Sequence, residues 1–178
     1  NASGEWYCEY GQVQFAASGL VKSENDAFDG WYYVRNGCVQ KGQETVVQNS
    51  SGWWYIGTDG KVDFHKNTVA PNEYGWGAVR NGAVDFQLNG IASNESGDWY
   101  CRGGQVDFGA AGVLESETEG FSGWYYIQNG CVQKGQETVK QNSNGWWYIG
   151  TDGKVDFGFS GIASNENGTW YIENGKVN

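Results

Sequence analysis

The 178-residue chain has a net charge of −10, and its 11 Lys and Arg residues are scattered along it. Binding to a nucleic-acid backbone or insertion at an anionic membrane would therefore lack an electrostatic driving force. No run approaches the roughly 20 apolar residues of a membrane-spanning helix. With 29 Gly, no Met and 10 Trp, the composition disfavours long helices and predicts an all-β protein.

Two segments occur twice in the chain at the same offset of 93 residues. Gly52 to Phe64 recurs letter for letter at Gly145 to Phe157, and Cys38 to Val46 recurs at Cys131 to Val139. The chain is therefore a tandem duplication, with one four-hairpin block at residues 1–93 and a second, truncated block at 94–178. Because it begins without Met and ends inside a repeat, we expect it to be a piece of a longer protein.

A shorter period of 22 to 26 residues runs through both blocks. Each unit holds aromatic residues, a turn dipeptide such as Asn-Gly or Asp-Gly, and an anchoring valine. Asn-Gly favours the type I′ turn of a two-residue hairpin, and a lone hairpin is marginal in water. The period therefore predicts an elongated solenoid of about eight stacked β-hairpins. The anchoring valines are Val13, Val39, Val62, Val84, Val106, Val132, Val155 and Val177.

The turn at Asn36-Gly37 predicts one hairpin residue by residue. Its register would pair Arg35 with Cys38, Val34 with Val39, Tyr33 with Gln40, and Tyr32 with Lys41. Side chains alternate along a strand, so Val34 and Tyr32 share one face while Trp31 and Tyr33 share the other.

The residue types at equivalent positions indicate which face is buried. The equivalents of Val34 are compact and apolar, so that face is predicted to be core, and the Tyr33 face to be half exposed. The phenylalanines two residues after an anchoring valine are predicted on the core face: Phe15, Phe64, Phe86, Phe108 and Phe157. The connectors between hairpins, such as residues 161–167, are predicted to be surface turns.

The four cysteines follow the duplication. Cys8 and Cys38 are 30 residues apart, as are their counterparts Cys101 and Cys131. We predict disulfides Cys8–Cys38 and Cys101–Cys131, which would indicate an oxidising, extracellular setting. Four buried free thiols are the alternative. No metal site is expected, because His65 is the one histidine and no CxxC occurs.

The acidic residues do not suggest catalysis. One equivalent position holds an aspartate in four units: Asp63, Asp85, Asp107 and Asp156. A glycosidase needs one carboxyl pair in distinct environments, whereas a residue repeated in many units is more typical of a strand-face or turn partner. We therefore predict that the chain is not an enzyme and needs no cofactor.

The repeated pattern of Gly-x-Trp-Tyr, a turn, a short strand and a Gly-apolar connector resembles the aromatic cell-wall-binding repeats. This family includes the choline-binding and glucan-binding modules of Gram-positive surface proteins, and Gly52 to Ile56 and Gly145 to Ile149 match it best. The resemblance implies a hairpin solenoid, secreted or at the bacterial surface, that attaches to a cell-wall polymer or glycan. Choline-type repeats have Trp after the connector Gly, where this chain has Leu20, Ile91, Val113 and Ile162. The resemblance therefore predicts the generic repeat rather than choline as the ligand.

The aromatic residues of the polar-tipped face are the predicted ligand platforms. Trp and Tyr rings stack on sugars or enclose quaternary amines. The residues are Trp31, Tyr33, Trp53, Tyr55 and their copies Trp124, Tyr126, Trp146 and Tyr148. The alternative is that these rings only fill contacts between hairpins. In that case, the chain would be a spacer or an adhesin for a host protein such as an immunoglobulin or mucin, contacted through residues 41–46 and 134–139.

Overall fold

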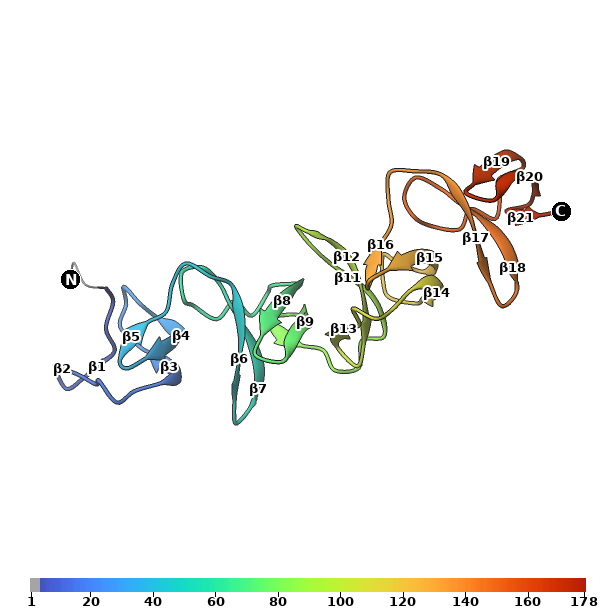
Figure 1. Cartoon of the computed structure of the whole chain (residues 1–178). Coiled ribbons are helices and arrows are strands. Elements are labelled where there is room, and N and C mark those ends of the chain that lie inside the picture. The colour runs from blue at the N-terminus through green and yellow to red at the C-terminus, as the bar shows by residue number, and fades with distance from the viewer. Residues whose placement is uncertain (1–3) are drawn as a thin grey trace. The chain divides into compact units, whose positions relative to one another are not determined.

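The computed structural model describes residues 4–178 and divides into two compact units, Asn1–Phe86 and Gln87–Asn178 (Figure 1). Strands and turns make up each unit, and the described residues contain no helix that could span a membrane. The predicted all-β array of stacked hairpins is confirmed. The division into repeat blocks at residue 93 stays a prediction about the duplication.

The described part of the first unit contains ten strands, six of five or six residues and four of two residues. They are β1 (Cys8–Glu9), β2 (Gln12–Val13), β3 (Gly19–Ser23), β4 (Gly30–Arg35), β5 (Cys38–Val39), β6 (Thr45–Asn49), β7 (Gly52–Ile56), β8 (Thr68–Asn72), β9 (Gly75–Arg80) and β10 (Ala83–Val84). Their antiparallel order within the unit is β1-β2, β3-β4-β5 and β6-β7-β10-β9-β8.

The second unit also combines strands of five or six residues with strands of two. Its strands are β11 (Gly90–Asn94), β12 (Gly97–Arg102), β13 (Gln105–Val106), β14 (Gly112–Ser116), β15 (Gly123–Gln128), β16 (Cys131–Val132), β17 (Thr138–Asn142), β18 (Gly145–Ile149), β19 (Gly161–Asn165), β20 (Gly168–Glu173) and β21 (Lys176–Val177). Two sheets result, one in the order β14-β15-β16-β12-β11 with β13 also paired to β12, and one in the order β17-β18-β21-β20-β19.

Each repeat forms two hairpins that share the aromatic strand. The long hairpin joins the connector to that strand, as in β19–β20, where Ile162 lies opposite Tyr171 and Ala163 opposite Trp170. The prediction that connectors are surface turns is wrong, because their alternating small and apolar residues pair as strands. The short hairpin returns to the anchoring valine, and each of the eight valines pairs with its core-face residue, as Val39 does with Val34.

The Asn-Gly turns have the predicted geometry. Asn36, Asn81, Asn129 and Asn174 have φ between 48° and 51°, and the glycines after them have φ between 74° and 78°. Both values belong to the type I′ turn. The Asp59–Gly60 turn differs, since only Gly60 has positive φ and the loop is closed by a 2.9 Å bond from Gly57 N to Lys61 O.

The predicted register holds only near the turn. Arg35 pairs with Cys38 and Val34 with Val39, and Gln40 N donates to Tyr33 O at 2.8 Å. Beyond that point the chain turns away, and Tyr32 pairs with Lys61 of the next repeat instead of with Lys41. A two-residue return strand leaves the edge of β4 open, and the next repeat occupies it.

The core lies between successive hairpins. The column of Val34 is buried as predicted at Val34, Ile56, Val79, Cys101, Ile127, Ile149 and Ile172, whereas Cys8 is exposed. Four of these residues, Val79, Ile127, Ile149 and Ile172, pack against the opposite face of the preceding hairpin in the same unit. Thus Ile149 clusters with Val113 of β14 and with Val155, and Trp124, Tyr126 and Trp147 surround them. The hairpins β14–β15 and β17–β18 are therefore covered on both faces.

The phenylalanines predicted in the core are at the surface instead. Phe15, Phe64, Phe86, Phe108 and Phe157 are 43–67% exposed. At Phe64, Phe108 and Phe157 the chain turns immediately after the short strand, because the preceding aspartate side chain accepts a backbone bond two residues on, as Asp156 Oδ1 does from Gly158 N at 2.8 Å. This turn directs the ring away from the core, and four of the five phenylalanines pack edge-on against a tryptophan.

The predicted disulfides are not formed, and all four cysteines are free thiols. Cys131 lies opposite Trp99, and a Cβ on Gly97 would lie 3.3 Å from its Sγ. Cys101 is two residues beyond Trp99 in the other direction, so the two Cα atoms are about 8 Å apart, outside the range of a disulfide. Equal sequence spacing did not reveal this offset between the strands.

Stacking makes a direct prediction about two isoleucines of the second unit. Ile149 is fully buried, whereas Ile162 is 64% exposed. We expect Ile149→Ala to lower the free energy of unfolding by about 2–5 kcal/mol through lost burial and a cavity. Ile162→Ala should change it by less than about 0.5 kcal/mol. Urea unfolding followed by Trp fluorescence measures both, and equal effects would contradict the stacked core.

The thiols should react in an order that follows their burial. Burial raises the pKa of Cys101 to about 12 and also raises that of Cys131. We expect iodoacetamide near pH 8, without reductant, to label all four cysteines, Cys8 fastest and Cys101 slowest, because the thiolate is the reactive form. Peptide mapping by mass spectrometry measures the order. Recovery of linked Cys8–Cys38 or Cys101–Cys131 peptides would show that the bridges form.

Candidate ligand-binding site

The predicted platform residues lie between hairpins. Tyr55 and Tyr148 are only 2% and 4% exposed, so the expectation of a half-exposed face is wrong for these two. The others are partly buried: Trp31, Tyr33, Trp53, Trp124, Tyr126 and Trp146. The face is covered because the next hairpin stacks on it.

The tryptophans of this face contact other rings. Trp53 packs on the cluster around Val46 and meets Tyr74 edge-on at 5.6 Å, and Trp146 stacks on Trp170 at 6.0 Å. Trp146 also contacts the buried cluster that includes Tyr148. These contacts give Trp53 and Trp146 a packing role, and ligand binding by their exposed parts stays a prediction.

Two buried tyrosines of this face are held in their neutral form. Burial, then a hydrogen bond to Glu137, raises the pKa of Tyr148 to about 12. The copy, Tyr55, has its pKa raised by burial and by Glu44 in the same way. The repetition of this tyrosine–glutamate contact in both units indicates a structural role.

A solvent-accessible aromatic group forms around the second tryptophan of the Trp-Trp pair. Trp147 and Phe157 meet edge-on at 5.5 Å, and Trp147 Nε1 donates to Asn142 Oδ1 at 2.9 Å. They line a cavity of about 270 Å³ together with Trp124, Asn144, Val155 and Lys176. Three aromatic rings at one cavity provide apolar surface and negative ring faces for a ligand.

The same arrangement occurs 93 residues earlier in the first unit. Trp54 and Phe64 meet at 5.4 Å, and Trp54 Nε1 donates to Asn49 Oδ1 at 3.1 Å. The bond from Val62 N to Trp31 O, at 2.9 Å, matches the 2.8 Å bond from Val155 N to Trp124 O. We call these two places the Trp54 site and the Trp147 site.

Reasoning from the sequence found Trp31 and Trp124 but missed the two tryptophans for which the sites are named. The signal was present, because an Asn stands five residues before each such Trp. Their indole–amide bonds are Trp54 to Asn49, Trp99 to Asn94, Trp147 to Asn142, and Trp170 to Asn165. The same Asn oxygens accept backbone bonds in the hairpin turn, as from Asn144 N at 2.9 Å. One residue therefore fixes both the turn and the ring.

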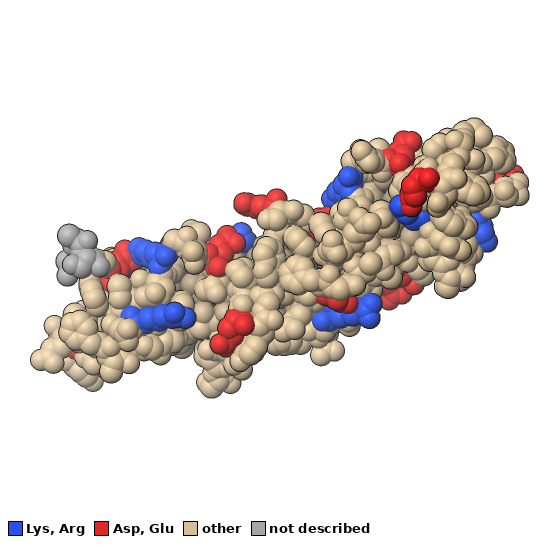
Figure 2. Space-filling view, in the orientation of Figure 1, with Lys and Arg blue, Asp and Glu red and all other residues tan. Residues whose placement is uncertain are grey.

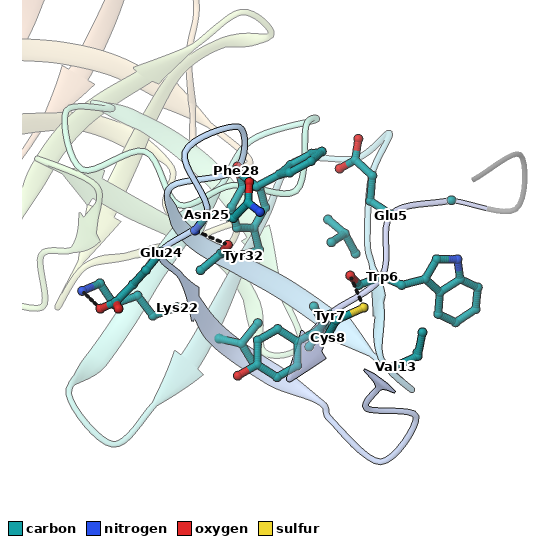
Figure 3. Close-up of a pocket in the computed structure, with 15 residues that line it drawn as sticks. Glu5, Trp6, Tyr7, Cys8, Val13, Lys22, Glu24, Asn25, Phe28 and Tyr32 are labelled. Carbon is teal, nitrogen blue, oxygen red and sulfur yellow. Dashed lines mark hydrogen bonds and ion pairs between the residues drawn. The ribbon is translucent and has the colours of Figure 1, made fainter. Parts of the chain in front are cut away.

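A larger cavity of about 720 Å³ lies against β4 in the first unit (Figure 3). Phe28 and Tyr32 line it, with Trp6 and Val13 across from them, and Lys22 pairs with Glu24 at 2.9 Å at its rim. This is the hairpin face that the preceding hairpin covers elsewhere in the stack. Here, among the residues that the structure describes, the segment around β1 and β2 lies against it.

The repeated aspartates bond to the backbone of their own turns. Asp63 and Asp107 accept bonds from His65 N and Gly109 N, which confirms the prediction that they are turn partners. Acidic and basic side chains are interspersed on the face shown in Figure 2. Within residues 4–178, no group of three or more His, Cys, Asp or Glu is placed to hold a metal ion.

The segments proposed for a protein partner, residues 41–46 and 134–139, are exposed over their first four residues. Lys41 and Lys134 stand in the phenylalanine column, two residues after an anchoring valine. They are exposed, but so are the phenylalanines. The lysines therefore do not distinguish the two repeats that contain them from the other repeats.

These features define a protein of stacked hairpin repeats with aromatic sites at hairpin junctions. The sequence profile of the choline-binding repeat matches residues 28–40, 44–63, 89–107, 122–133 and 158–178. The resemblance to this repeat family that the sequence predicted is confirmed. A search of curated proteins found no match.

Several solved structures are similar to this chain at low identity. Choline binding protein F from Streptococcus pneumoniae is 20% identical over 92% of this chain, with a TM-score of 0.36, and this chain covers 49% of its length. The modular autolysin LytC of the same organism, in complex with a synthetic peptidoglycan ligand, is 12% identical over 90% of this chain and is covered to 42%, with a TM-score of 0.34. Alternansucrase in complex with isomaltononaose is 14% identical over 98% of this chain and is covered to 16%, with a TM-score of 0.31. The chain thus spans about half the length of choline binding protein F.

The raised tyrosine pKa values predict a loss of stability in alkali. Because the folded-state pKa of Tyr148 is about 12, above the ordinary value of 10, its contribution is complete below pH 10 and is lost as the pH rises toward 12. We expect Tyr148→Phe to make the fall in unfolding free energy above pH 10 shallower. Tyr171→Phe, in the same column but exposed, is the control. Urea unfolding across this pH range is the measurement, and identical profiles for wild type and Tyr148→Phe would contradict the assignment.

Proposed function

We propose that the chain is a non-catalytic, cell-surface module that attaches to a cell-wall polymer through the Trp54 and Trp147 sites. The observation that carries this proposal is the pair of Trp–Phe groups, one in each unit, in which an Asn holds a partly buried tryptophan beside an exposed phenylalanine. At the Trp147 site these rings line a cavity, and fixed rings beside a cavity are suited to ligand binding. The choline-binding repeat profile supports the same function.

The recognised group on the polymer is proposed to be a methylated ammonium such as choline. Aromatic faces attract such cations, and a net charge of −10 raises their local concentration. The absence of Trp after the connector Gly argued against choline at the level of sequence. At the Trp147 site, however, the three rings come from Trp124, Trp147 and Phe157. Val113, which follows the connector Gly where choline-type repeats have Trp, is buried in the cluster that Trp124 and Trp147 surround.

Removal of the two exposed phenylalanines should weaken wall binding without unfolding the chain. Phe64 and Phe157 are 43% and 50% exposed, so the double change Phe64→Ala and Phe157→Ala should leave the melting temperature nearly unchanged. Loss of one ring–ammonium contact per site, at about 0.5–1 kcal/mol, should weaken binding about twofold to fivefold. Co-sedimentation with purified choline-containing cell walls, with and without free choline as competitor, measures it.

The control is Tyr10→Ala, which removes a fully exposed ring outside both sites. It should bind walls as wild type does. Wild-type binding that resists choline but is displaced by a wall glycan would assign the sites to sugars. Unchanged binding by the double variant would remove the two sites from the function.

A further inference from the structure

The two aromatic sites differ at one position that touches the ring. The residue after the turn glycine lies opposite the site tryptophan, and it is Ala83 in the first unit and Lys176 in the second. Asn49, Trp54 and Phe64 have identical counterparts, and Ser51 is replaced by Asn144. The duplication therefore supplies two nearly matched sites with different residues over the indole.

Lys176 lies across its site. Its Nζ is 5.3 Å from the centre of the Trp147 ring, within the range of a cation–π contact. Its side chain also passes directly over Gly145, since a Cβ there would lie 2.8 Å from Lys176 Cε. The ammonium thus occupies the position that a ligand cation would take over this ring.

The arrangement recurs wherever lysine holds this position, so it is a property of the fold. Lys61 lies opposite Tyr32 with Nζ 5.8 Å from the ring centre, and Lys154 lies opposite Tyr125 at 5.6 Å. In both cases the lysine also covers the glycine two residues before the ring, Gly30 and Gly123.

The Trp54 site is open by comparison. The side chain of Ala83, opposite Trp54, is a single uncharged methyl group. Among residues 4–178, no cation lies over the Trp54 ring. The atoms nearest to a Cβ placed on Gly52 belong to the Trp54 indole itself, at 3.7 Å or more. The rings and the asparagine are in place, while the internal ammonium is missing.

We infer that Lys176 is an internal competitor for cationic ligands, so that of the two proposed sites the Trp54 site is open and binds more tightly, whereas the Trp147 site is self-occupied and binds more weakly. This inference rests on the proposed function, because it requires that the sites take an ammonium group. Lys176 weakens ligand binding in two ways: its stem covers the approach over Gly145, and its charge repels a second cation.

The test uses the indole N–H signals of Trp54 and Trp147 in two-dimensional NMR, assigned with Trp54→Phe and Trp147→Phe. Both indoles donate to an asparagine, so each signal reports on its own site. Choline chloride is titrated into wild type, Lys176→Ala, Ala83→Lys and the double exchange, and its neutral isostere 3,3-dimethylbutan-1-ol is the control ligand. Lys176→Arg retains the charge and should leave the Trp147 site closed.

In wild type, we expect Trp54 to respond to choline at least about tenfold more tightly than Trp147. Lys176→Ala should bring Trp147 close to the affinity of Trp54, Ala83→Lys should remove the response of Trp54, and the double exchange should interchange the two sites. Equal affinities in wild type, or a Trp147 that stays silent in Lys176→Ala while Trp54 responds, would overturn the inference. Silence of both indoles in every variant would instead reject choline recognition, and the inference with it. An equal response to the neutral isostere would show that charge is not recognised and would also overturn it.

Discussion

The stacking of one hairpin on the next is the interaction on which the rest of the structure depends. A single hairpin of this size cannot exclude water from its side chains, so its stability comes from its neighbours. In this chain, the column of Val34 and Ile149 on one hairpin packs against the valine and aromatic face of the hairpin before it. Burial is therefore shared by pairs of repeats, and the hairpins β14–β15 and β17–β18 of the second unit are covered on both sides.

This arrangement also decides where a ligand could bind. Because both broad faces are buried, accessible rings remain mainly at the edges of the junctions, where the chain turns after the short strand. There Phe64 and Phe157 emerge beside the second tryptophan of the pair. The asparagine that caps the long hairpin also fixes that tryptophan, so the element that makes the turn also orients the site.

The duplication separates features that the fold requires from features that are free to change. The asparagine, both tryptophans, the phenylalanine and the valine of the site are the same in both copies. The residue over the ring is not, since it is Ala83 in the first copy and Lys176 in the second. Such a position can change the ligand preference of one junction without disturbing its neighbours.

The sequence by itself determined the local structure of this protein. The Asn-Gly dipeptides specify the type I′ turn, which fixes the pairing of Val34 with Val39 and its equivalents, and the repeat period gives the number of units. Strand alternation correctly placed Trp31 and Tyr33 on one face and Val34 on the other. Each of these features depends on residues within a few positions of one another.

Only the tertiary structure decided which faces are covered and which strand edges meet. Tyr55 and Tyr148 are buried because the next hairpin stacks on them, and alternation alone cannot reveal that contact. Phe64 and Phe157 look like core residues but are turned outward by the aspartate turn before them. The cysteines share an equal spacing, yet their strands are offset by two residues, so the thiols stay apart. Lys176 reaches Trp147 from the following repeat, and such contacts between repeats depend on how the hairpins stack rather than on any local pattern.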